Sequence, residues 1–237
     1  MNNTMDNVNL RAVVLDILLE NDKNPGHSNL ITGQALSKFQ YLPKSQRAFI
    51  SRLAEGTIER RIEEDWLIDH VSSVSTKKMK PVIRNIMRMS AYQLKYMDSV
   101  PVSAVCNEAV KLARKRGFSS LTGFVNGVLR SLARDINNIQ YPDKSDFIRY
   151  CMIRYSMPEY VVRILMDECG SCTEDVLKGF EKEHRLYIRC NTGLITPGGL
   201  KKKLTDEGVT VEDTCVPYAF AISAVSYTHL RAHETTL

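Results

Sequence analysis

Residues 100–115, VPVSAVCNEAVKLARK, and residues 124–130, FVNGVLR, decide the fold of this chain. Val100-Pro101 breaks the preceding segment. Apolar residues then recur every three or four positions, which predicts one helix over about residues 102–116 and another over about 119–135. Because the connection between them is short, we expect the two helices to pack against each other in antiparallel fashion.

The same periodicity continues towards the N-terminus. Asp6 or Asn7 can cap a first helix. One long helix is predicted over about residues 43–71, and Gly56 inside it indicates the close approach of another helix. Residues 6–138 therefore predict a compact all-α domain.

The pattern changes after residue 141. Residues 142–184 predict a helical connector, and apolar residues then alternate with polar ones from Leu186, as in a half-buried strand. Thr196-Pro197 opens a helix that Gly208 ends, and two short strands follow. Residues 185–224 thus form an incomplete small α+β domain of the order β-α-β-β, and the fold class is mainly α.

The last residues differ from the rest of the chain. Val225–Thr235 resembles one reading frame of a transposon-type sequencing adaptor, so we expect residues 225–237 to be an artefact tail and the gene to continue past about Ala224. His229 and His233 have metal-ligand spacing but belong to this tail, and no metal site is predicted.

Composition and charge narrow the class of protein. The chain has 237 residues, 43% hydrophobic and 25% charged, without a signal peptide or an apolar run of the ~20 residues that span a membrane. With six irregularly spaced cysteines, this predicts a cytoplasmic protein. Residues 1–140 hold 20 Lys+Arg and 13 Asp+Glu (+7), and residues 141–237 hold 12 and 14 (−2). The positive half favours a polyanionic partner, although a solvated basic surface is the alternative.

A basic cluster ends the helix over 102–116. It contains Lys111, Arg114, Lys115 and Arg116. These cations can contact phosphate, or they can stabilise the C-terminal end of their own helix through its dipole.

Three polar residues interrupt the apolar faces of the same helix pair: Asn107, Glu108 and Asn126. Buried polar groups need partners, so we expect Glu108, Asn126 and Arg130 to bond with one another across the two helices and fix their register. Contact with RNA is the alternative role. Gly127 is expected to allow tight packing at this point.

Three stretches of the first domain resemble the NusB-like RNA-binding family: Leu10-Arg-Ala-Val13, residues 100–115 and residues 124–130. The resemblance covers about residues 6–138. It implies RNA contacts and places Arg11 where the family has a basic first helix, although the surrounding residues lack a richer arginine cluster. The candidate RNA-binding residues are therefore Arg11, Lys111, Arg114, Lys115, Arg116 and Arg130.

Residues 142–224 resemble the segment that follows this domain in bacterial 16S rRNA cytosine-C5 methyltransferases, the RsmB-like Sun/Fmu branch of the Nol/Nop/Sun family. The matching stretches are YIRCNT at 187–192, TPGGLKKKL at 196–204 and EGVTV at 207–211. The resemblance implies an S-adenosylmethionine-dependent enzyme acting on 16S rRNA, with contacts to ribosomal or transcription proteins also open.

The catalytic parts that this resemblance implies are not visible in the chain. The family uses two cysteines and a glycine-rich cofactor turn in a doubly wound domain. Here all six cysteines are interpreted as structural, and Cys169-x-x-Cys172 is a weak zinc signal. We therefore expect this chain by itself to bind no cofactor and to be inactive. The alternative is a NusB-type antitermination factor, which should end soon after the FVNGVLR helix.

Overall fold

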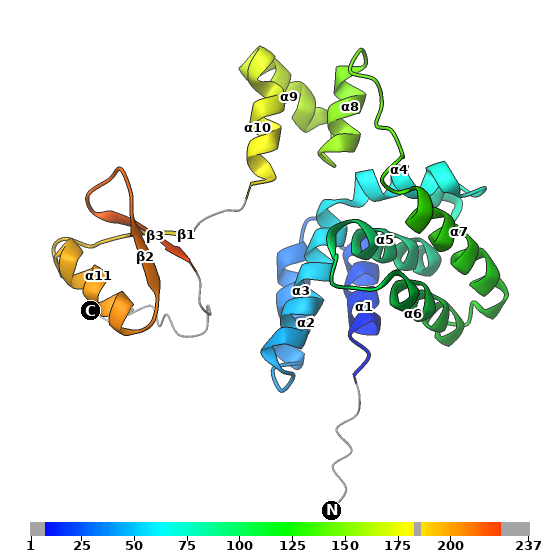
Figure 1. The fold of residues 1–237 in the computed structure, drawn as a ribbon, viewed down its shortest axis with the longest axis horizontal. Helices are drawn as coiled ribbons and strands as arrows, with labels where there is room; N and C mark the ends of the chain where they lie inside the picture. The colour runs from blue at the N-terminus through cyan, green and yellow to red at the C-terminus, as the bar shows by residue number, and fades with distance from the viewer. Residues whose placement is uncertain (1–7, 183–185, 224–237) are drawn as a thin grey trace, which may run out of the picture. The chain divides into compact units, whose positions relative to one another are not determined.

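The computed structural model describes residues 8–182 and 186–223 (Figure 1). These residues fall into two compact units, one ending at Gly179 and the other beginning at Phe180. The predicted tail at 225–237, with His229 and His233, lies outside the described residues, as do Asp6 and Asn7.

The first unit begins with a bundle of α-helices, as predicted. Its elements are α1 (Leu10–Lys23), α2 (Ser28–Lys38), α3 (Lys44–Glu59), α4 (Arg61–Val71), α5 (Pro81–Tyr96), α6 (Val102–Lys115) and α7 (Thr122–Asp135), with single turns η1 (Thr76–Lys78) and η2 (Ser119–Leu121). Helix α5 contacts α1, α3, α4, α6 and α7, which makes it the centre of the core. Large side chains buried there include Leu15, Ile50, Leu53, Ile68, Ile86, Leu112 and Leu129.

The start of the bundle differs in one cap from the sequence prediction. Asn9 is the N-cap of α1, and its side chain accepts a hydrogen bond from the Ala12 amide at 3.0 Å. The cap satisfies one of the free amides of the first turn.

The predicted long helix over 43–71 is wrong, because the chain forms two helices that separate at Arg60. The Ile62 amide donates to the Ser156 hydroxyl at 3.0 Å instead of continuing the helical ladder. Since Ser156 lies 94 positions further along the chain, local periodicity could not reveal this break. The close approach at Gly56 is confirmed, since a Cβ there would lie 2.1 Å from Tyr92 Cζ on α5.

The helical connector forms α8 (Phe147–Arg154), α9 (Glu159–Cys169), the turn η3 (Gly170–Cys172) and α10 (Thr173–Phe180). It belongs to the first compact unit and contacts α4 through α8. The Trp66 indole donates to the Gln140 carbonyl at 3.2 Å, and the Arg149 guanidinium lies 5.3 Å from the centre of the Trp66 ring.

A buried carboxylate ties the segment between α7 and α8 to the bundle. Glu63 on α4 is fully buried and accepts from Lys95 Nζ at 2.7 Å and from the hydroxyls of Tyr96 and Tyr141. Burial and the Glu63 carboxylate raise the pKa of both tyrosines, so their hydroxyls stay protonated donors. Loss of any one of these donors should lower the stability of the fold, because it leaves the buried charge incompletely compensated.

The second unit has the predicted β-α-β-β order, with β1 (Leu186–Arg189), α11 (Pro197–Asp206), β2 (Thr210–Asp213) and β3 (Ala219–Ser223). Its antiparallel sheet has the strand order β1-β3-β2. The Thr196 hydroxyl caps α11 by accepting from the Gly199 amide at 3.2 Å, and Gly208 adopts a φ of +81° where α11 has ended.

Candidate nucleic-acid interface

Helices α6 and α7 form a shallow groove of about 410 Å³. Three of its lining residues come from α6 and four from α7: Asn107, Val110, Lys111, Thr122, Gly123, Asn126 and Arg130. The short connection through η2 makes the two helices a hairpin, so residues far apart in sequence face the same hollow. The structure thus brings four of the candidates named from the sequence to one place: Asn107, Lys111, Asn126 and Arg130.

Cations extend from the groove along α6. Lys111, Arg114 and Lys115 follow Asn107 at spacings that place them on one helical face, and all three are exposed. Lys111 pairs with Glu108 at 2.8 Å. Within residues 8–182 and 186–223, Arg114 and Lys115 form no ion pair, so both charges are available to an anion.

A second hollow, of about 320 Å³, lies at the start of α1 and is lined by Asn9, Arg11, Phe49 and Glu108 among others. Arg11 Nε donates to the Gln93 side chain at 2.8 Å, and the guanidinium lies 5.2 Å from the centre of the Phe49 ring. Burial lowers the pKa of Arg11 from its ordinary value, and the nearby Glu108 opposes this shift. The Arg11 guanidinium is therefore held in place at the second hollow.

Glu108 links the two hollows. It bonds with Lys111 on the groove side and accepts from Asn9 Nδ2 at 3.5 Å on the other side. The hydrogen bond from Lys111 is the largest cause that lowers the pKa of Glu108, which is consequently ionised at neutral pH.

The predicted network among Glu108, Asn126 and Arg130 is wrong in its pairing. Asn126 and Arg130 bond within α7 at 3.3 Å, whereas Glu108 bonds with Lys111 and Asn9. Asn107 is exposed, and Gly127 is also exposed with nothing near the position of an added Cβ. Asn107 and Gly127 therefore lie at the surface, whereas Glu108 and Asn126 are half-buried.

Arg116 differs from the other members of the basic cluster. Its guanidinium turns to α1 and pairs with Asp16 at 2.6 Å, where the arginine side chain is about one-third exposed, at 31%. This ion pair joins the end of α6 to α1 across 100 positions of sequence. A contact of Arg116 with RNA stays a prediction.

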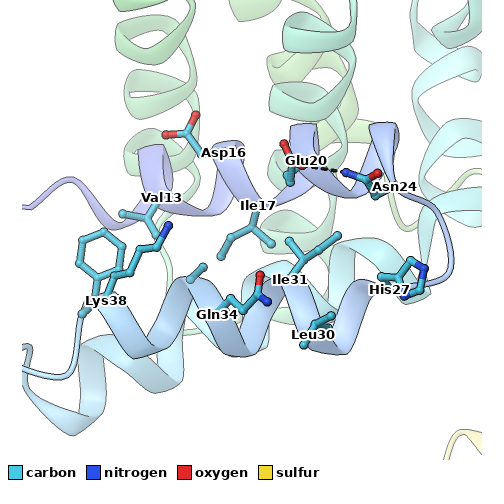
Figure 2. A pocket seen from close by; sticks show the side chains of 12 residues that line it. Val13, Asp16, Ile17, Glu20, Asn24, His27, Leu30, Ile31, Gln34 and Lys38 are labelled. Carbon is cyan, nitrogen blue, oxygen red and sulfur yellow. Dashed lines mark hydrogen bonds between the residues drawn. The ribbon is translucent and has the colours of Figure 1, made fainter.

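A third hollow, of about 570 Å³, lies between α1 and α2 (Figure 2). Figure 2 shows the carboxylates of Asp16 and Glu20 on the α1 side of an apolar floor that includes Ile17 and Ile31. Asp16 pairs with Arg116 and Glu20 pairs with Lys23, and we do not include this hollow in the candidate interface.

The cysteines are free. Cys106, Cys151 and Cys190 are buried, whereas Cys172 and Cys215 are exposed. In the part of the chain that the structure describes, no three potential metal ligands converge. None of the helices described is long and apolar enough to cross a bilayer.

Three contributors to the interface escaped the sequence prediction. Thr122 and Gly123 line the groove directly after η2, and Phe49 lies beneath Arg11. The available signal for the groove was Gly123, which lies on the same face of α7 as the polar pair Asn126 and Arg130. Phe49 gave no signal, since its spacing is that of an ordinary core residue.

The fold and this surface define a class, an all-helical domain with an exposed cationic groove. The NusB family matches residues 8–134, which is more than half of the chain. A transcription antitermination protein NusB of Bacillus velezensis is 34% identical over 92 residues, which cover 38% of this chain and 71% of that protein. The chain belongs to the NusB family.

Similarity to other proteins continues beyond this domain. A Bacillus subtilis protein named Probable ribosomal RNA small subunit methyltransferase B is 27% identical over 209 residues, 88% of this chain and 46% of that protein. The chain thus spans about half the length of this relative. The crystal structure of PH0851 has the same fold over 92% of this chain and 48% of its own, with a TM-score of 0.60 at 18% identity.

Proposed function

We propose that this chain is the RNA-binding front portion of a bacterial 16S rRNA cytosine-C5 methyltransferase that acts in the cytoplasm. One observation carries the proposal: the alignment with the methyltransferase B relative covers 88% of the chain, well beyond the NusB-family match that ends at residue 134. An alignment of 209 of the 237 residues must therefore extend beyond the bundle and into the second unit. Methyl transfer and the catalytic cysteines are proposed for the whole protein only.

The residues described here do not fit the S-adenosylmethionine site of such an enzyme. That site needs a glycine-rich turn between a strand and a helix of a parallel sheet. The sheet of the second unit is antiparallel, and the seven-residue segment between β1 and α11 contains Gly193 but no G-x-G sequence. The cofactor therefore belongs to the proposal for the whole protein, and no step is assigned to it here.

The cationic surface of the bundle supplies the proposed RNA contact. Arg114 and Lys115 offer unpaired charges, and the groove adds amide and guanidinium donors from Asn126 and Arg130. Such groups bind phosphate and sugar, which positions a protein on folded RNA without reading its sequence. The same bundle surface could hold ribosomal or transcription proteins as further partners of the assembly.

The RNA contact is tested with the full chain and a fragment of unmodified 16S rRNA in a salt series. Each phosphate contact contributes about 0.7–0.9 to the slope of log K against log salt. The double variant Arg114→Ala/Lys115→Ala should therefore lower the slope by about 1.4–1.8. The matched control is Lys77→Ala/Lys78→Ala, which removes two exposed lysines from η1. Equal slopes for both variants and the unaltered chain would contradict the proposal.

A NusB-type antitermination factor is the second candidate, favoured by the 34% identity of the bundle to the Bacillus velezensis protein. The two functions are distinguished in cells of the source organism that lack the gene. Bisulfite sequencing of 16S rRNA should show the loss of a methylated cytosine if the chain belongs to a methyltransferase. Unchanged methylation together with altered transcription termination would favour the second candidate.

A further inference from the structure

The sheet of the second unit has one covered face and one open face. Side chains alternate along a strand, so Leu186 and Ile188 share the face of Phe220 and Ile222, both of which are buried. Leu204 of α11 is buried too, and α11 contacts the sheet through β2. The opposite face has no helix among residues 186–223.

An aromatic residue and an arginine lie on the open face of β1. Tyr187 is 63% exposed and lies opposite Ala221, while Arg189 lies opposite Ala219. Because the β3 partners are alanines, the two long side chains rise above a shallow floor. The Arg189 guanidinium lies 5.2 Å from the centre of the Tyr218 ring, which is itself 41% exposed.

The spacing of these groups suits nucleobases. Residues two apart on a strand are separated by about 6.6 Å, roughly twice the ~3.4 Å rise between stacked bases of one strand. Tyr187 and the Arg189–Tyr218 pair can therefore accept two neighbouring bases that have opened from their stack. Tyrosine rings and guanidinium planes are the groups on which proteins stack unpaired RNA bases.

The charge of this face favours RNA over an apolar protein surface. Within residues 186–223 no carboxylate pairs with Arg189, so its charge is open to a phosphate. Asp213 lies opposite Phe220 on the covered face, where it pairs with Lys201 at 2.6 Å, so it adds no charge to the open face.

We propose that the open face of the sheet, with Tyr187 and Arg189 on β1 and Tyr218 beside Arg189, binds single-stranded RNA by base stacking. This proposal rests on the proposed function in taking RNA as the ligand, and it adds a second, chemically different contact. The bundle would hold phosphates of folded RNA, while the second unit would hold an unpaired segment.

The test uses the full chain and a fluorescein-labelled single-stranded RNA of about ten nucleotides, followed by fluorescence anisotropy. Tyr187→Ala should weaken binding between about fivefold and a hundredfold, the range that stacking of one base supplies. Tyr187→Phe keeps the ring and should bind like the unaltered chain. Tyr160→Ala is the matched control, because Tyr160 on α9 is 67% exposed and lies in the first unit.

Two further readouts separate base stacking from a purely ionic contact. Tyr187→Ala removes no charge, so the salt slope should stay unchanged, and ultraviolet crosslinking should attach the RNA at Tyr187 in the unaltered chain. Circular dichroism checks that the variant folds, with Arg189→Gln as a second variant expected to weaken binding in the same range.

Each result decides the proposal. If Tyr187→Ala binds as tightly as the unaltered chain, or if Tyr160→Ala weakens binding equally, stacking on this face is refuted. If Arg114→Ala/Lys115→Ala lowers the salt slope while Tyr187→Ala has no effect, the proposed function stands and only this inference fails. If the unaltered chain binds neither folded nor single-stranded RNA, both fail.

Discussion

Tyr141→Phe tests whether the segment between α7 and α8 shares one buried polar centre with the bundle. The change keeps the ring, which packs under Lys95 Nζ at 5.0 Å, and removes only the hydroxyl that donates to Glu63. Glu63 is fully buried and keeps Lys95 and Tyr96 as donors. Because a hydrogen bond to a charged group contributes about 1.5–3 kcal/mol, the free energy of unfolding should fall by that amount.

Urea and thermal unfolding followed by circular dichroism measure this loss. For a unit of this size, 1 kcal/mol corresponds to about 2–4 °C, so the Tm should fall by about 3–12 °C. Tyr150→Phe is the control, since its hydroxyl lies 3.5 Å from Glu174 in a weak and partly exposed contact. A change below about 0.5 kcal/mol for Tyr141→Phe would refute the bond to the buried carboxylate and the coupling it provides.

Two further substitutions probe the bundle core. Glu64 is buried without a hydrogen-bond partner for either carboxylate oxygen among the described residues, and burial raises its pKa well above the ordinary value. Between the unfolded-state pKa of about 4.3 and the raised pKa, the folded state therefore holds a proton on Glu64 that the unfolded state has lost. In this pH window the free energy of unfolding should fall by about 1.4 kcal/mol per pH unit as the pH rises. Glu64→Gln should flatten this slope in urea unfolding at pH 5, 6 and 7. Gly56→Ala should cost about 1–3 kcal/mol, since its Cβ would lie 2.1 Å from Tyr92 Cζ. The same change in a Tyr92→Leu background should cost much less, and equal costs in thermal unfolding would disprove the clash.

The sequence by itself determined most of the elements and their order, but not the break between α3 and α4. Apolar spacing placed α6 and α7, and alternation from Leu186 placed β1. The cap at Thr196 and the turn at Gly208 were readable because both act on backbone groups only a few residues away. The quoted stretches at 100–115 and 124–130 also carried the family resemblance that the match over 8–134 supports.

Tertiary structure alone decided which side chains meet. The separation of α3 from α4 depends on Ser156, and the orientation of Arg116 depends on Asp16. The partners of Glu108 changed for the same reason, because Asn9 lies 99 positions away. Periodicity reports which side of a helix is apolar, but polar partners at the rim depend on how neighbouring helices are rotated and spaced. That arrangement follows from packing of the whole core, which no local stretch of sequence contains.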